Sequence, residues 1–208
     1  RTINAMDNNG VNIGLVTLMG TRAPIAAKAH PDRFLLCSPI DPNDVMGSVI
    51  KIRKDHFMHG IRAVSFFPSG CDPHVPIDDA KTYPIYATCV ELDLPIFINA
   101  GVPGPRVIGD SQNVSRFDPV CYDFPDLKIV MRHGAEPDEA LAVKLMLKWP
   151  NLYYSTSAFA PKHYPKAIID YANTRGSGKI IYGGDFPFGL ELDRIMEEME
   201  GVPFRDHV

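Results

Sequence analysis

Two side chains with catalytic potential follow apolar segments of this sequence. His133 follows the run 128–131 after one intervening residue, Arg132, and Gly134 behind it leaves room for a ligand. An imidazole in such a place can bind a metal, act as a general base or donate to an oxyanion. Asp185 follows two glycines, and its carboxylate can bind a metal and accept a proton from the metal's water. Each residue also has a structural interpretation, as a hydrogen-bonded histidine and as a cap for the turn before Pro187.

Two further residues are candidates for binding a substrate. Asn99 ends the apolar run 95–98, and a stretch rich in glycine and proline, residues 101–105, follows it. Such a loop is stiff and leaves space for a ligand. Arg106 at its end can pair with a substrate carboxylate, since a guanidinium forms charge-assisted hydrogen bonds with carboxylates. An ordinary surface arginine is an equal alternative at that position.

Short runs rich in β-branched and aromatic residues must position these groups. Most runs are apolar at successive positions, which is typical of strands covered on both faces in parallel sheets. The seven runs are residues 13–18, 34–37, 61–67, 95–98, 128–131, 152–155 and 180–182. Helical periodicity lies between them, most clearly at residues 45–52, 85–92 and 142–149. Pro137 and Pro165 are expected in the first turns of two helices, and Pro150 is expected to end one.

Alternating strands and helices predict a parallel α/β fold, either a closed barrel or an open doubly wound sheet. The glycine-rich turn of a dinucleotide-binding fold is missing after the first run, where Gly20 stands alone. The 208 residues are about one βα unit short of the roughly 250 typical of an eight-stranded barrel. A helical pattern over residues 3–11 precedes the first run, so we expect the first strand to be the absent one. We treat residues 1–208 as one domain.

Composition excludes several classes of protein. The chain has 25 acidic residues against 21 Lys and Arg and a net charge of −4, which disfavours nucleic-acid binding. No apolar stretch is long enough to cross a bilayer and the start lacks a signal pattern, so we expect a cytoplasmic protein. The four cysteines lie far apart, which favours reduced thiols over a disulfide framework.

Four segments together resemble the amidohydrolase-related family, the branch of the amidohydrolase superfamily that includes aminocarboxymuconate-semialdehyde decarboxylase. They are residues 95–101 (PIFINAG), 129–134 (IVMRHG), 152–157 (LYYSTS) and 182–187 (YGGDFP). The resemblance implies a TIM (β/α)8-type barrel. Members usually hold a divalent metal, often zinc, through a His-x-His pair on the first strand, a His on the fifth and an Asp on the eighth.

Residue by residue, the resemblance covers only part of that site. Asp185 corresponds to the eighth-strand Asp, and His133 corresponds to a sixth-strand His that assists catalysis. Asn99 stands where the fifth-strand His is expected, and the first strand with its His-x-His pair is absent. His133 and Asp185 are therefore the candidate catalytic and metal-binding residues.

The resemblance implies a metal-dependent hydrolase or decarboxylase that acts on a small carboxylated compound. Asn99 and Arg106 are the candidate substrate-binding residues, and zinc is the expected metal. The alternative is a barrel with an incomplete metal site, which binds a ligand without turnover or uses metal-independent acid–base chemistry through His133 and Asp185. The expected partner is a small-molecule substrate, and an uncovered sheet edge favours a homo-oligomer.

Overall fold

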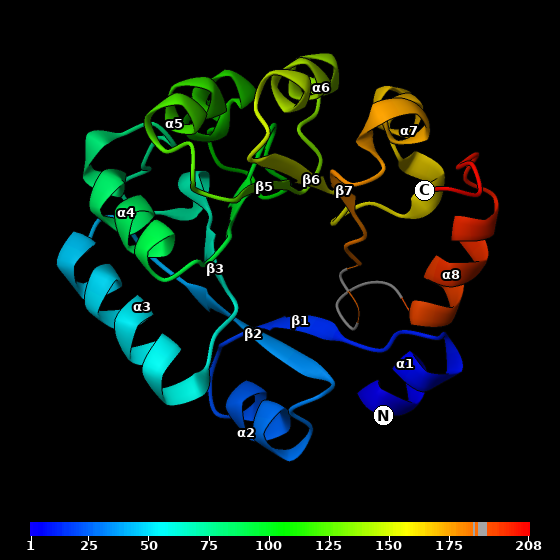
Figure 1. The fold of residues 1–208 in the computed structure, drawn as a ribbon, viewed down its shortest axis with the longest axis horizontal. Coiled ribbons are helices and arrows are strands. Elements are labelled where there is room, and N and C mark those ends of the chain that lie inside the picture. The colour runs from blue at the N-terminus through cyan, green and yellow to red at the C-terminus, as the bar shows by residue number, and fades with distance from the viewer. Residues whose placement is uncertain (185, 187–190) are drawn as a thin grey trace.

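The computed structural model describes residues 1–184, 186 and 191–208. Within these residues seven parallel strands form one sheet, in which the strands follow one another in chain order. They are β1 (Gly14–Thr17), β2 (Phe34–Pro39), β3 (Ala63–Phe66), β4 (Ile96–Asn99), β5 (Ile129–Arg132), β6 (Leu152–Ser155) and β7 (Ile180–Ile181). The sheet curls into a ring with the helices outside it (Figure 1). All seven predicted strands are therefore confirmed, and the fold is a TIM-type barrel.

Eight α-helices in the described part of the chain surround the sheet. They are α1 (Thr2–Asn8), α2 (Arg22–Ala29), α3 (Val45–His59), α4 (Tyr83–Glu91), α5 (Phe117–Asp123), α6 (Glu139–Lys148), α7 (Lys166–Tyr171) and α8 (Leu192–Glu200). The longest, α3, is defined at both ends. The Asp44 side chain accepts a hydrogen bond from the Gly47 N–H, and Gly60 ends the helix in the left-handed conformation.

The proline predictions were correct at one position and wrong at two. Helix α6 stops at Lys148, directly before Trp149 and Pro150, as expected. Pro137 lies outside α6, because Asp138 occupies the position before the first helical residue. Pro165 has the extended ψ of 134° and precedes α7 instead of joining its first turn. Both prolines thus lead into a helix from extended or turn backbone, which a fixed proline φ also permits.

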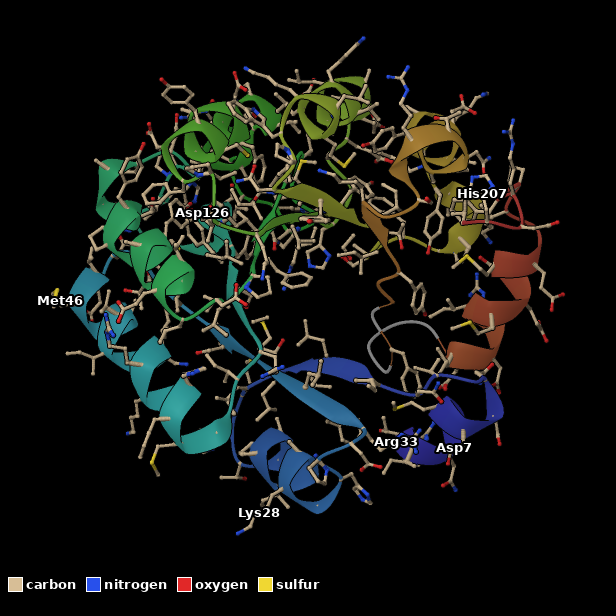
Figure 2. The ribbon with its side chains drawn as sticks, in the orientation of Figure 1. Asp7, Lys28, Arg33, Met46, Asp126 and His207 are labelled. Carbon is tan, nitrogen blue, oxygen red and sulfur yellow. The ribbon has the colours of Figure 1, made fainter. Side chains whose placement is uncertain are left out.

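The ring is open between its first and last strands. No pair between β1 and β7 occurs among the described residues, which is consistent with the expected absence of the first strand of an eight-stranded barrel. Outside this opening α1 and α8 lie side by side (Figure 1), and the Asn9 side chain donates to the Asp193 carboxylate over 2.5 Å. The start of the chain is also tied to β2, because Arg33 pairs with Asp7 at 2.6 Å; both side chains are labelled beside α1 in Figure 2.

The main hydrophobic core lies between the sheet and the helices. Successive strand residues alternate between this core and the inside of the ring, as the pleat of a strand requires. In β4, Ile96 and Ile98 face the core and are completely buried, whereas Phe97 between them lies outside the core cluster and is only half-buried. Complete burial of one such isoleucine stabilises the fold by roughly 2–3 kcal/mol.

Two expectations from composition can be compared with the structure. None of the helices in the described ranges combines the length and the apolar character that a bilayer-crossing segment requires. All four cysteines are free thiols, three of them buried and Cys71 half-buried.

The loops that follow β4 and β5 are held together at Gly101. Its φ of 77° is in the left-handed region, and a Cβ atom there would lie 2.5 Å from the backbone oxygen of Glu136. The N–H of Val102 donates to that same oxygen over 2.8 Å, while Gln112 Nε2 donates to the Gly101 carbonyl over 2.9 Å. Only glycine permits this approach without displacing backbone. The contact fixes the loop after Asn99 against the loop after His133.

We therefore expect Gly101→Ala to lower the free energy of unfolding by about 2 kcal/mol or more, because it combines left-handed strain with a backbone clash. Urea denaturation measures this. Gly104→Ala in the same loop is the matched control, since a Cβ atom at Gly104 meets nothing within 4 Å. Equal stability of the two variants would contradict the proposed contact.

Candidate functional site

Asn99 and Arg132 end neighbouring strands at the same level of the sheet. The register pairs Asn99 directly with Arg132, and both alternate with core-facing residues, Ile98 and Met131. Their side chains therefore face the inside of the ring at its carboxyl rim, the edge where all the strands end. Asn99 is 7% exposed, and its Oδ1 is buried without a hydrogen-bond partner among the described residues. Such an acceptor is costly to leave unpaired, which makes it a place for a ligand donor.

His133 is held at a sharp bend immediately after β5. Its φ of 65° is unusual for a residue other than glycine. The His133 N–H donates to Ser157 Oγ over 3.2 Å, which ties the bend to the loop after β6. Gly134 has a φ of 110°, and a Cβ atom there would lie 2.6 Å from the Phe159 ring. The strained bend fixes the backbone of His133, and the Nδ1 atom of its imidazole is shielded from solvent.

The segment after β7 approaches the same loop. The Gly183 N–H donates to Thr156 Oγ1 over 3.2 Å, and a Cβ atom on Gly183 would lie 2.4 Å from Ser155 Oγ. The sequence therefore needs glycine here so that the chain can pass close to β6. Asp185, two residues further on, lies outside the described residues.

Arg106 lies in the loop after β4, between Asn99 and the start of α5. It is exposed in the loop after β4, and no described residue forms a hydrogen bond or an ion pair with it. The structure thus brings Asn99 and His133 to one rim and leaves the Arg106 side chain exposed to solvent.

A cavity of about 290 Å³ opens at this rim, on the side of β1, β2 and β3. Five polar residues line it: Thr17, Asp41, Ser65, Cys71 and Arg132. Apolar side chains complete its wall, among them Met19, Ile40 and Phe67. Among the described residues, neither Asn99 nor His133 belongs to this lining.

Arg132, like Thr17 and Asp41, is a lining residue that our reasoning from the sequence missed. The signal was present, because a cation ends an otherwise apolar strand directly before His133. A charged residue within a buried run is uncommon without a partner or a function. The interpretation relied on the adjacent His133 instead, and it did not use the alternation that turns Arg132 inward.

The thiols near the cavity are protonated at neutral pH. Burial raises the pKa of Cys71 to about 12, and the nearby Asp41 carboxylate adds to the shift. Burial also raises the pKa of Cys37, although a hydrogen bond with Ser65 and the charge of Arg132 oppose the shift. A neutral thiol is a poor nucleophile, so neither cysteine is suited to covalent catalysis.

The described residues do not by themselves form a metal site. No group of three or more His, Cys, Asp or Glu side chains that could hold a metal ion occurs in the described ranges. Protein zinc sites use three or four such ligands, and a neutral amide oxygen such as that of Asn99 is a weak substitute for imidazole.

Comparison with known proteins extends the resemblance noted above. The sequence model of the family described as amidohydrolase matches residues 3–194. A search of curated proteins gives no match. Among solved structures, an uncharacterised TIM-barrel protein from Bordetella bronchiseptica is 24% identical, with a TM-score of 0.84 over 99% of this chain and 76% of the other.

Two further similar structures are decarboxylases. A 2,6-dihydroxybenzoate decarboxylase from Rhizobium is 14% identical, with a TM-score of 0.76 over 99% of this chain and 82% of the other. A 5-carboxyvanillate decarboxylase from Novosphingobium aromaticivorans, complexed with manganese and 4-hydroxy-3-methoxy-5-nitrobenzoic acid, is 16% identical, with a TM-score of 0.73 over 99% and 74%. Because all three sequence identities are below 25%, these structural similarities support the barrel fold alone.

The raised pKa of Cys71 predicts slow alkylation. At pH 8 far less thiolate is present than for a thiol of ordinary pKa, and the greater nucleophilicity of the thiolate offsets only part of that loss; we expect iodoacetamide to react about 50-fold more slowly than with free cysteine. The rate should rise about tenfold per pH unit, because the thiolate fraction keeps growing until the pH approaches 12. Mass spectrometry follows the modified residue, and Cys71→Ser supplies the background. A rate that levels off near pH 9 would contradict the burial.

Proposed function

The chain is an enzyme of the amidohydrolase family, and we propose that it acts as a hydrolase or a decarboxylase on a small carboxylated compound. The observation that carries this proposal is the family match over residues 3–194, a range that includes both His133 and Asp185. The two decarboxylases among the similar structures, which are named for aromatic acids, support a carboxylated substrate.

His133 and Asp185 are the proposed catalytic residues. Loss of carbon dioxide leaves an electron pair on a carbon atom that must then receive a proton, whereas hydrolysis needs a group that takes a proton from water. Histidine can do either near neutral pH, because its unperturbed pKa is about 6.5. We propose that His133 performs this proton transfer, as the donor in a decarboxylation or as the acceptor in a hydrolysis. The Asp185 carboxylate is the proposed second group of the acid–base pair.

Asn99 and Arg106 are the proposed substrate-binding residues. The buried Oδ1 of Asn99 supports this role, since a hydroxyl or amino group of a substrate would supply the hydrogen bond that the described residues do not. Arg106 is exposed in the loop after β4, from which its guanidinium can approach a carboxylate at the rim.

A divalent metal is supported by the manganese in the 5-carboxyvanillate decarboxylase, and His133 and Asp185 are its proposed ligands. Zinc, the metal that the family resemblance suggests, has no separate support. The described residues contain no three-ligand group, so by themselves they do not fit a tightly held ion.

A ligand-binding barrel without metal-dependent turnover is the second candidate function. Asn99 favours it, because this residue stands where the resemblance expects a histidine ligand. In that case His133 and Asp185 would perform metal-independent acid–base chemistry or none.

We expect His133→Ala and Asp185→Ala each to lower turnover by about 100-fold or more, the usual effect of losing a general acid or base. Carbon dioxide release from 2,6-dihydroxybenzoate and 5-carboxyvanillate is a direct first assay. His59→Ala, at the exposed end of α3, is the matched control and should keep full activity. Full activity in both site variants, with unchanged circular dichroism, would show that the strand-end assignment is wrong.

Metal analysis separates the two candidate functions. Protein purified without added metal should contain one equivalent of a divalent ion if the metal-dependent function is correct, and a chelator should remove activity that manganese or zinc restores. Activity that persists in metal-free protein would instead support the second function.

A further inference from the structure

The outward face of α3 carries a row of large apolar side chains. Met46, Ile50 and Phe57 are 63%, 61% and 87% exposed, although residues of these types are usually buried. At 3.6 residues per turn they fall within about 40° of one another around the helix axis. The opposite face of the helix is buried against the barrel, for instance at Ile52. Figure 2 shows the labelled Met46 on the outer side of α3, away from the barrel.

Arg53 completes this row, and its charge is already paired. Its guanidinium donates two hydrogen bonds to Glu91 at the end of α4, over 2.8 Å to Oε1 and 2.6 Å to Oε2. The hydrogen bonds from Arg53 hold the pKa of the Glu91 carboxyl below its usual range, so both groups stay charged at neutral pH. A surface that covers the row therefore meets a neutralised ion pair instead of a lone charge, which would be costly to bury.

Small residues of α4 border the row. The exposed Pro84 and Ala87 precede Glu91 at the spacing of one helix face. The helices α3 and α4 lie side by side outside the sheet (Figure 1), and both follow strands of one direction. Because the Arg53–Glu91 pair joins their outward faces, Ala87 lies at about the level of Ile50. The outward face of α4 thus presents small side chains at this level, which leaves space for a partner helix along α3.

The row is complementary to itself. When two α3 helices lie antiparallel about a two-fold axis that passes between residues 51 and 52, position 46 of each copy faces position 57 of the other. Met46 then packs against the Phe57 ring of the second copy, which is a favourable sulfur–aromatic contact. Ile50 faces the alkyl part of Arg53 in the second copy, which can cover apolar surface while its charge remains with Glu91. A two-fold interface requires such self-complementarity, because every contact occurs twice.

The exposed area of the row matches a small specific interface. Phe57, which is 87% exposed, presents on the order of 150–200 Å² by itself. With its neighbours the row offers roughly 500 Å² per copy, a size that commonly marks a functional surface on a monomer. Two copies would bury roughly 1,000 Å², which is the lower limit for a specific interface, so we expect a dissociation constant in the micromolar range.

We propose that the outer face of α3 is the interface of a homodimer, in which the two α3 helices lie antiparallel and Met46 packs against Phe57 of the second copy. None of the described residues that line the cavity at the carboxyl rim belongs to α3. Dimerisation through this face therefore does not depend on the proposed function.

Sedimentation equilibrium of the unmodified chain from about 1 to 200 µM measures the association. We expect Phe57→Asp to weaken dimerisation by about 100-fold or more, because it removes the aromatic contact twice per dimer and places a charge in the interface. Leu147→Asp is the matched control, since it introduces the same charge at an exposed apolar position of α6, on another side of the ring (Figure 1). It should leave the dissociation constant unchanged. Circular dichroism checks that both variants are folded.

An exchanged charge pair tests the antiparallel arrangement. Met46→Lys and Phe57→Glu should each weaken dimerisation, whereas the double variant should regain about tenfold in affinity, because the new cation faces the new anion of the second copy. The two positions are about 16 Å apart along one helix, so they do not pair within a monomer. An unmodified chain that stays monomeric at about 200 µM, a Phe57→Asp variant that dimerises as the control does, or a double variant no tighter than the single ones would overturn the proposal.

Discussion

Hydrogen bonding between parallel strands is the constraint on which the rest of this structure depends. Because all seven strands run in the same direction, their carboxyl ends meet at one rim of the ring. The pleat then decides which side chains face inward at that rim. Asn99 and Arg132 are paired in register there, and His133 follows at the next position. Chemistry-bearing residues that lie more than 30 positions apart in the chain are thus assembled by backbone geometry alone.

The loops refine what the strands assemble. Gly101 lets the loops after β4 and β5 touch through their backbones, and the left-handed bend at His133 ties β5 to Ser157. The first contact requires a glycine, and the second holds a non-glycine residue in a strained conformation. Strained backbone of this kind is common where a protein holds a functional group in place. Among the described residues β1 and β7 do not pair, and the contacts between the loops after β4, β5 and β6 help to keep this rim in place.

The strands could be predicted because a buried parallel strand is marked by its own residues. The runs 128–131 (KIVM) and 152–155 (LYYS) each contain three apolar or aromatic residues in succession, and the structure makes strands of both. A single proline was a less reliable marker of where a helix begins. Pro137 shows this, because the fixed φ of proline suits both the first turn of a helix and the segment before it.

The site was harder to predict than the fold. The sequence indicated that Asn99 and His133 lie at strand ends, but a cavity depends on how side chains from several strands combine. The place of Arg132 in the cavity became clear only when the alternation of β5 was combined with the positions of Ser65 on β3 and Asp41 in the loop after β2. Asp185 lies outside the described residues, so its role stays a prediction.

The central claim is that one rim of the barrel gathers the groups that bind and transform a small acid. Amide chemical shifts recorded by NMR during titration with a meta-hydroxybenzoate test it most directly. We expect the changes to concentrate at Thr17, Ser65, Asn99, Arg132 and His133, with none at Asn151, which contacts the Leu127 carbonyl before β5 at the opposite end. Changes centred on Asn151 and its surroundings, or no changes at the carboxyl rim, would contradict the account.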